Sequence, residues 1–556
     1  MKKALITAMA LFMVFISACG TSGSDAGNSE EPKEAPSSEA GQESEAPANI
    51  DPYGPVAEKV TITIGKAVAA DPKLPEGSTV EDNEYTRFIE DKLNVDFKHA
   101  WQATGDAYAQ KVSLSVTSGD IPDVMVVSKS ELTQLVRSDL VEDLTQAYET
   151  YASDNLKGAY ESTNGYALRS ATYDGKLMAM PNVSPGADGV NLLWVRQDWL
   201  DALGLQPPKS LDDVLAIAKA FKEQDPDKNG KADTFGLLGS QNIVNLGNST
   251  FGFDTVFSLF DSYPELWYEK DGEIVYGSVQ PETKEALAKL SEMYKSGLID
   301  QEFGVKNTDM AVEHVVSGKS GIFFGPWWLP FWPLNDAVSQ DPKAEWKAYL
   351  APLNDEGVMN THVMAPTVQY LVVKKGFKSP EAVVKTLNYQ FDMDQTQGEQ
   401  FYQGMDVPFG WTNMPFTLLL SRFDDKESKT LKVQSVIDGK ADVSTLEGEA
   451  KQIYESYIKD KENPKKDLGA WSQANAFMTG VKPLTEDNIY RQYGAFYDQT
   501  ETMTKRWANL QKLEDEAFLQ IILGTRSIDY FDEFVAKWKE QGGDKITEEV
   551  REAAKE

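Results

Sequence analysis

The 556-residue chain has few of the side chains that bind transition metals or form disulfides. It contains one cysteine and three histidines, which excludes an intrachain disulfide and leaves too few ligands for a zinc site of histidines and cysteines. Basic residues are also scarce, because 54 Lys and Arg stand against 87 Asp and Glu, a net charge of −33. A surface this acidic repels phosphate backbones and anionic lipid headgroups, so we expect no nucleic-acid partner and no charge-driven membrane binding.

The composition is otherwise that of a folded protein. Hydrophobic residues make up 41% of the chain and aromatic residues 11%, enough to build large cores and to exclude global disorder. At about 150 residues per domain, the length predicts two or more domains.

The N-terminus has the features of an export signal. Two lysines precede an uncharged, mostly apolar stretch at residues 4–18, which is shorter than the roughly 20 residues of a membrane-spanning helix but typical of a signal peptide. Residues 16–19 read Ile-Ser-Ala-Cys, which resembles the bacterial lipobox. We therefore predict a signal peptide at 1–18 and a lipidated (palmitate-bearing) Cys19. The alternative is an ordinary secretory signal with an incidental cysteine.

Residues 19–55 have the composition of a tether. Ser, Gly, Glu, Ala and Pro dominate this stretch, and its first aromatic residue is Tyr53. Such a segment buries too little apolar surface to offset the entropy of ordering it. We expect it to connect the lipid anchor to a globular body on the extracellular face of the cell membrane.

The globular body alternates strand and helix patterns. Residues 59–64, 95–97 and 123–127 read as strands, and residues 85–93 and 107–117 read as helices. This alternation predicts βαβ units and a largely parallel sheet.

The rest of the body adds further elements. Ser210 and Asp213 form a capping box before a helix, which precedes a predicted strand at 234–238. Pro281 begins a helix that stops near Gly297. From about residue 451 the chain reads as helical, and its final helix is expected to end at residues 542–543, which are both glycine.

The common enzyme motifs are mostly absent from the sequence. Residues 318–320 (Gly-Lys-Ser) lack the upstream glycine of a phosphate-binding loop, because Glu313 stands at its position. The chain has no G-x-S-x-G, H-E-x-x-H or G-x-G-x-x-G motif. A pair of catalytic carboxylates, as in glycosidases, remains open among 87 acidic residues.

One acidic loop has the spacing of a calcium site. Side-chain oxygens stand at positions 1, 3, 5 and 9 of an EF-hand-like loop, a glycine stands at position 6, and position 7 offers a backbone carbonyl. These positions are Asp225, Asp227, Asn229, Asp233, Gly230 and Lys231. Position 12 is Gly236 in place of the bidentate glutamate, so a regulatory EF-hand is excluded. We predict a structural calcium ion, and the alternative is an acidic turn without metal.

A second signal is aromatic. Three of the twelve tryptophans lie within residues 327–332, in a segment interrupted by Pro and Gly. Tryptophans of this kind either stack on sugar rings or fill a core. For Trp507 and Trp538, at helical spacing, we predict the core; for the 327–332 segment both interpretations stay open.

Several stretches together resemble the extracellular solute-binding lipoproteins of the LipO type, in the large family that feeds carbohydrates to ABC importers. They read SGDIPDV (118–124), DGKL (174–177), LWVRQDWL (193–200), GPW (325–327) and LVV (371–373). They run from about residue 60 to the C-terminus, and their order is more specific than any single motif.

The resemblance implies an α/β protein with the type II periplasmic-binding-protein fold, in which two α/β lobes close over a ligand cleft. Lobe one would comprise residues 56–181 and about 362–416. Lobe two would comprise residues 182–361 and about 417–556.

The resemblance also implies a function and a site. The protein would bind an oligosaccharide or related carbohydrate and deliver it to the permease subunits of an ABC transporter, as a monomer and without catalysis. Trp327 matches the sugar-stacking tryptophan of the family's G-P-W segment, and Trp194, Trp328 and Trp411 lie near expected lobe crossings. The calcium loop is similar to one in alginate-binding relatives, although Thr234 replaces their acidic residue after position 9. The alternatives are a surface-anchored hydrolase with a carboxylate pair and a purely structural lipoprotein.

Overall fold

The computed structural model describes residues 50–69, 74–244, 246, 250–396 and 413–554. Its first sheet has five strands in the order β2-β1-β3-β13-β6. Strands β1, β2 and β3 are parallel, as predicted, whereas β13 runs antiparallel to both β3 and β6. The bounds are β1 (Val60–Ala67), β2 (Val95–Ala103), β3 (Val124–Val127), β6 (Met180–Pro181) and β13 (Tyr370–Val373).

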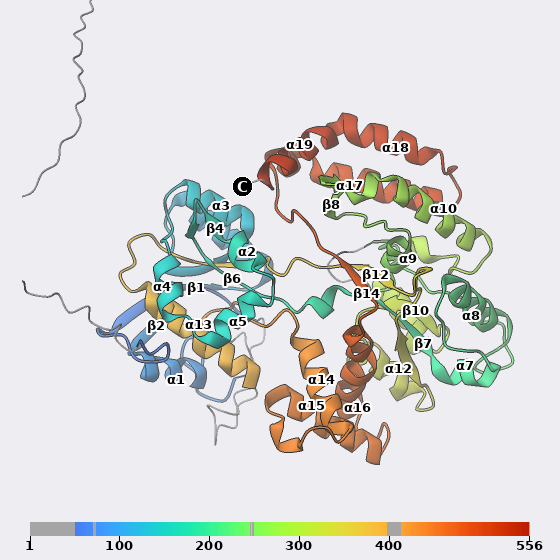
Figure 1. Cartoon of the computed structure of the whole chain (residues 1–556), viewed down its shortest axis with the longest axis horizontal. Helices are drawn as coiled ribbons and strands as arrows, with labels where there is room; N and C mark the ends of the chain where they lie inside the picture. The colour runs from blue at the N-terminus through green and yellow to red at the C-terminus, as the bar shows by residue number, and fades with distance from the viewer. Residues whose placement is uncertain (1–49, 70–73, 245, 247–249, 397–412, 555–556) are drawn as a thin grey trace, which may run out of the picture. The chain divides into compact units, whose positions relative to one another are not determined.

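Helices cover both faces of this sheet (Figure 1). One group packs around α13, and another lies against β1, β2 and β13. The first group is α1 (Glu84–Leu93), α4 (Thr145–Tyr151), α5 (Asp154–Glu161) and α13 (Pro380–Thr396), and the second is α2 (Gly105–Ser118) and α3 (Lys129–Arg137). Their apolar faces and the sheet form one hydrophobic core, drawn from residues 56–183 and 370–420.

The second sheet differs from the sequence prediction. It has three strands in the order β10-β7-β11, and both outer strands are antiparallel to the central one. The bounds are β7 (Leu192–Arg196), β10 (Ile322–Gly325) and β11 (Trp346–Tyr349), with α12 (Leu334–Gln340) between the last two strands. The alternation of strand and helix was correct, but β7 inserts between the two strands that the helix connects, so the prediction of a parallel sheet is wrong here.

Of the other described elements, α6 packs on β6 of the first sheet, and two pairs of strands form short hairpins. The remaining elements surround the second sheet or extend the chain to its C-terminus. In chain order, all these other elements are α6 (Tyr166–Ser170), β4 (Thr172–Tyr173), β5 (Lys176–Leu177), η1 (Gly186–Gly189), α7 (Gln197–Leu203), α8 (Leu211–Glu223), α9 (Asp254–Leu259), β8 (Trp267–Lys270), β9 (Glu273–Tyr276), η2 (Gly277–Val279), α10 (Pro281–Lys295), η3 (Phe303–Val305), α11 (Thr308–Val316), β12 (Met359–His362), α14 (Asp425–Ile437), η5 (Val443–Thr445), α15 (Gly448–Glu462), α16 (Leu468–Asn475), η6 (Ala476–Val481), η7 (Lys482–Thr485), β14 (Ile489–Gln492), α17 (Glu501–Ile522), α18 (Tyr530–Trp538), η8 (Lys539–Gly543) and α19 (Asp544–Ala553).

Local signals predicted the helix boundaries well. The Ser210 side chain accepts from the Asp213 backbone amide, which completes the predicted capping box of α8. Helix α10 begins at Pro281, and Gly297 adopts the left-handed φ of +68° just after its end. These signals act through backbone groups only a few residues away, so distant parts of the chain change them little.

Two local predictions are wrong. Residues 234–238 form no strand, because their backbone amides bond to separate segments, at Lys319, Leu298 and Ile322, and only Leu237 makes a β-bridge, with Ile299. The glycines at 542–543 do interrupt the helix that ends at Trp538, since Gly542 has a φ of +127°. They do not end the fold, however, because α19 follows directly.

Candidate functional site

Three chain segments cross side by side between the first sheet and the rest of the structure. They are residues 182–191, 363–369 and 413–424, and backbone hydrogen bonds join the first segment to both others. These bonds run from Asn182 N to Gln369 O (2.9 Å), Ser184 N to Pro366 O (2.9 Å), Val183 N to Leu419 O (3.2 Å), Ser421 N to Val183 O (3.1 Å) and Gly186 N to Phe423 O (2.7 Å).

The crossing segments approach one another closely. A Cβ atom on Gly186 would lie 2.5 Å from the Phe423 ring, so a larger residue there would push two crossings apart. The first crossing leaves the sheet at the carboxyl end of β3, since Pro181 and Val127 both pair with Tyr370. In open α/β sheets, ligands bind outside the carboxyl ends of the strands, so the crossings mark the side of the sheet where a ligand is expected.

Trp327 lies against the first crossing and beside the start of α14 (Asp425–Ile437), which follows the third crossing. It follows β10 in a non-helical turn and is 6% exposed. Its indole Nε1 donates to Asp188 Oδ1 at 2.9 Å, and the Lys426 Nζ atom lies 5.7 Å from its ring centre. The Phe477 ring centre lies 5.1 Å away on another side. The predicted platform is thus held by Asp188 of the first crossing, by Lys426 of α14, just after the third crossing, and by the rings of Phe331 and Phe477.

A buried ionic network surrounds Lys426. Its ammonium lies 3.2 Å from Asp425 Oδ2 and 3.3 Å from Glu449 Oε2, and Lys429 lies 2.8 Å from each of the same two oxygens. Burial lowers the pKa of Lys426, but the carboxylates of Glu449 and Asp425 more than offset this, so the ammonium stays charged. Burial also raises the pKa of Asp394, beside this network, to about 6.

The remaining predicted tryptophans have different positions. Trp194, in the centre of β7, is fully buried, and its Nε1 donates to Pro326 O at 3.1 Å, next to Trp327. Trp328 is half-buried against the hydrophobic cluster that contains both Trp194 and Trp327. Trp411 lies outside the described residues. The structure therefore brings Trp194 and Trp328 to the backbone that holds Trp327, and contact of any of them with a ligand remains a prediction.

Sequence reasoning missed Asp188 and Lys426. Asp188 precedes Trp327 by 139 residues, Lys426 follows it by about a hundred, and no motif marks either residue. Only the crossing of the three segments brings them together. Trp332 lies in the same tryptophan-rich segment but is not among the predicted ligand residues, and it is 40% exposed.

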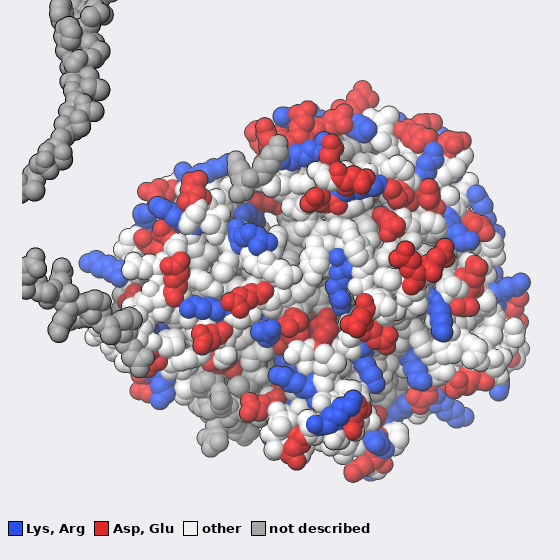
Figure 2. All heavy atoms as spheres, viewed as in Figure 1, with Lys and Arg blue, Asp and Glu red and all other residues white. Residues whose placement is uncertain are grey.

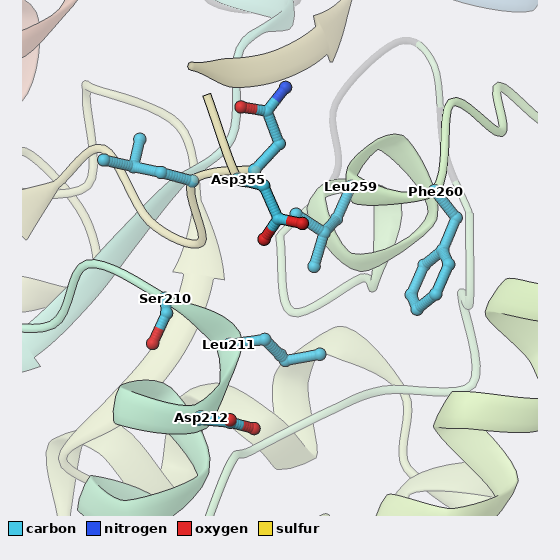
Figure 3. Close-up of a pocket in the computed structure, with 8 residues that line it drawn as sticks. Ser210, Leu211, Asp212, Leu259, Phe260 and Asp355 are labelled. Carbon is cyan, nitrogen blue, oxygen red and sulfur yellow. The ribbon is translucent and has the colours of Figure 1, made fainter. Parts of the chain in front are cut away.

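A separate pocket of about 300 Å³ opens elsewhere in the structure (Figure 3). It lies between the start of α8, the end of α9 and the turn after β11. Ser210, Leu211, Asp212, Leu259, Phe260, Leu353, Asn354 and Asp355 line it. The pocket contains none of the predicted ligand residues, and none of its lining residues belongs to the crossing segments.

Charges of both signs are interspersed on the face of the molecule that Figure 2 shows. Acidic side chains occur over most elements in view, and no broad basic area interrupts them. This face gives no sign of a nucleic-acid-binding surface.

The predicted calcium loop folds around the Asn229 side chain. The Asn229 amide Nδ2 donates to Asp227 Oδ2 at 2.7 Å and to Asp233 Oδ1 at 3.0 Å. Asp225 accepts from the backbone amides of Asn229 and Gly230 at 3.1 and 3.0 Å. Burial, followed by contact with Asp225, raises the pKa of Asp227. The spacing therefore does bring the acidic side chains together, and the fifth predicted ligand, the Lys231 carbonyl, lies in the same turn.

The carboxylates are nevertheless not arranged as a metal site. Within the described residues, no group of three or more His, Cys, Asp or Glu side chains is placed to hold a metal ion. In this structure the Asn229 amide nitrogen, which is a donor and not a metal ligand, lies between the carboxylates of Asp227 and Asp233.

The predicted signal peptide and Cys19 lie outside the described residues, as does the tether up to residue 49. Among the helices that the structure does describe, none has the length and apolar character needed to cross a membrane.

Comparison with known proteins agrees with the fold. A family model described as bacterial extracellular solute-binding protein matches residues 77–397. "Polygalacturonan/rhamnogalacturonan-binding protein YtcQ" of Bacillus subtilis is 24% identical over 84% of this chain and 87% of its own length. "Lipoprotein LipO" of the same organism is 26% identical over 45% of this chain and 48% of its own length.

A solved structure has the same overall fold. It is the Streptococcus pneumoniae ABC-transporter substrate-binding protein FusA, an EF-hand mutant in complex with fructo-nystose. Its TM-score is 0.57 at 17% identity, and the match covers 89% of this chain and 99% of that one. The α/β architecture, with its five-stranded and three-stranded sheets, is thus the fold of periplasmic solute-binding proteins. Since the family model covers more than half of its length, the chain belongs to the bacterial extracellular solute-binding proteins.

Proposed function

We propose that the protein captures an oligosaccharide outside the cell and delivers it to the permease subunits of an ABC transporter. The observation that carries this proposal is the family match over residues 77–397. Two relatives are named for carbohydrate ligands: YtcQ for polygalacturonan and rhamnogalacturonan, and FusA for its complex with fructo-nystose. The family consists of binding proteins and not of enzymes, so the alternative of a carboxylate-pair hydrolase is not supported.

The proposed cleft lies between two lobes that the three crossings connect. Lobe one is residues 56–181 and about 362–416, and lobe two is residues 182–361 and about 417–556. The first hydrophobic core supports this division, because its members come from residues 56–183 and 370–420. Trp327 is the proposed sugar platform, since Asp188 of the first crossing accepts a hydrogen bond from its indole and Lys426, just after the third crossing, lies over its ring.

A thermal-shift screen across oligosaccharides tests this function. A ligand that binds only the native state raises the melting temperature by mass action. We expect stabilisation by at least one glycan class, with the ligand recovered intact. Shorter products after incubation would instead indicate a hydrolase, and a flat response to every glycan would favour a structural lipoprotein.

We further propose a structural calcium ion at residues 225–233. The side chains of Asp225, Asp227, Asn229 and Asp233 and the carbonyl of Lys231 would be its ligands, once the Asn229 amide turns its oxygen inward. An EF-hand named in the FusA structure supports this proposal. We expect Asp227→Ala to lower the melting temperature and to abolish any stabilisation by calcium. Equal melting of the wild-type protein in calcium and in chelator would contradict it.

Cys19 is the proposed lipid anchor that keeps the protein on the extracellular face of the cell membrane. A relative named as a lipoprotein supports this assignment. We expect Cys19→Ala to release the chain into the medium or to leave its signal uncleaved, because the chain has no other cysteine. A processed variant that still sediments with membranes would refute the anchor. We expect the mature protein to be a monomer.

A further inference from the structure

Lys66 is a buried cation at the edge of the first sheet from which the crossings leave. It stands one residue before the end of β1 and is 1% exposed. Its ammonium donates to Met414 O, at the start of the third crossing. Within the described residues, Lys66 forms no ion pair, and the Met414 carbonyl is the one acceptor of its ammonium. A buried ammonium has three N–H donors, so this environment leaves two of them unmatched.

His99 adds a further unmatched donor on the same face of the sheet. The register pairs Ile64 with His99 and, after an irregularity that adds one residue to β2, pairs Lys66 with Gln102. Ile64 and Lys66 lie on the same face of β1, so Lys66 and His99 lie near each other on that face, close enough for the charge of Lys66 to act on His99. The His99 side chain is 2% exposed, and its Nδ1 atom lies 2.8 Å from the Gln102 amide nitrogen. Since that amide can only donate, Nδ1 accepts and the proton is on Nε2. This Nε2 atom is buried without a hydrogen-bond partner in the part of the chain that the structure describes.

The charged groups around this pair are few. Glu81 accepts from the His99 backbone amide at 2.6 Å, and the Lys98 ammonium lies 3.8 Å from the Glu81 carboxylate. Burial lowers the pKa of Lys66 to about 7, and burial, followed by the charge of Lys66, lowers the pKa of His99 to about 4. Asn413 Oδ1, next to Met414, is buried and unpartnered within the described residues. In this environment, donors without a partner outnumber acceptors without one. A ligand that pairs with these donors must therefore offer acceptor oxygens.

We propose that Lys66 and His99 form a subsite for the carboxylate of an acidic sugar, so that the captured oligosaccharide contains hexuronic acid. A carboxylate has two oxygens that accept charge-assisted hydrogen bonds from an ammonium and from an imidazole N–H. Its position at the carboxyl end of β1 places the subsite on the side of the sheet where such proteins bind ligands. Met414 belongs to the third crossing. A ligand that accepts from Lys66 therefore competes with the Met414 carbonyl, in a segment that joins the lobes. This inference rests on the proposed function.

Calorimetry with matched acidic and neutral probes tests the inference. The probes are trigalacturonate, trimannuronate and the methyl esters of both, titrated into the wild-type protein at pH 8 in two buffers of different ionisation enthalpy. We expect at least one free acid to bind ten or more times more tightly than its ester. We also expect that acid to be bound with proton uptake, because a carboxylate beside Lys66 favours its charged form.

Substitutions at Lys66 separate the subsite from general charge effects. Lys66→Met should abolish both the preference for the acid and the proton uptake, and Lys66→Arg should retain the preference. The matched control is Lys385→Met, because Lys385 also is buried and donates to a backbone carbonyl, that of Gly54. This control should keep the preference. If Lys66→Met does not fold, the proton uptake of the wild-type protein still decides the question.

The possible results are distinct. Equal affinities for acid and ester without proton uptake would overturn the inference and leave the proposed function intact. Binding of other oligosaccharides but of neither uronate would have the same meaning, and a preference that survives in Lys66→Met would assign it to another residue. Failure to bind any glycan would refute both the inference and the proposed function.

Discussion

Two buried tryptophans of the same protein have very different surroundings. Trp327 is 6% exposed and Trp538 is 1% exposed. The Trp538 ring stacks on Tyr276 with centres 5.1 Å apart, and its Nε1 has no hydrogen-bond partner within the described residues. Trp327 instead donates to Asp188 and lies beside a lysine. Burial alone therefore does not distinguish these two tryptophans, whereas their polar neighbours do, and we propose Trp327 as the one that contacts a ligand.

The largest effect on stability is expected at Trp538. Trp538→Ala removes an indole from the hydrophobic core that α17 and α18 form with β9, where it packs on the Tyr276 ring. The variant should lose about 3–5 kcal/mol of unfolding free energy. Its ligand affinity, measured below the melting transition, should not change. Chemical denaturation and calorimetry check both quantities, and an altered affinity would place Trp538 in the binding machinery.

The two regions should also differ in pH dependence. Burial raises the pKa of Asp394, near Lys426, to about 6, and burial, followed by the charge of Asp254, raises that of Glu265, in the region of Trp538, to about 8. A carboxyl group whose pKa is higher in the folded state stabilises the fold at low pH, and this stability is lost as pH rises through the folded pKa.

In the wild-type protein, the free energy of unfolding should therefore fall by up to about 3 kcal/mol as the pH rises from about 4 to about 6, and Asp394→Asn should abolish this fall. Glu265→Gln should remove a loss that extends to about pH 8. Denaturation midpoints of the wild-type protein and both variants from pH 4 to pH 9 provide the test. Parallel pH profiles for all three proteins would contradict the assignment.

The effect at Trp327 should appear in affinity. Trp327→Ala lowers stability too, since the side chain is buried, but it should also weaken oligosaccharide binding by about 2 kcal/mol or more, as expected for a central contact residue. Trp327→Phe retains a ring but loses the hydrogen bond to Asp188, so its affinity should lie between those of the wild-type protein and Trp327→Ala. Asp188→Asn retains an acceptor and should have the smallest effect. Normal affinity in folded Trp327→Ala would assign this side chain to the core.

The sequence predicted well those features that depend on neighbouring residues. The Ser210 capping box, the Pro281 helix start, and the core position of Trp538 follow from spacing along a few turns, and the structure confirms all three. The order of short motifs predicted the family, which the comparison with known proteins confirms.

The sequence could not predict features that depend on the packing of distant segments. The antiparallel second sheet arises because β7 inserts between β10 and β11. Residues 234–238 form no strand because their backbone amides bond to separate distant segments. Asp188, Lys426 and Trp327 meet only where three crossings run side by side, and Lys66 stands out only through its burial. None of these relations has a local sequence signal.

The most direct test of the account is equilibrium dialysis of the mature protein against a mixture of oligosaccharides, with mass spectrometry of the retained and free sugars. We predict that one glycan class is retained saturably at one molecule per protein, and that every sugar is recovered with its original mass. Retention of no glycan, or the appearance of shorter products, would contradict the conclusion that this protein binds an oligosaccharide without transforming it.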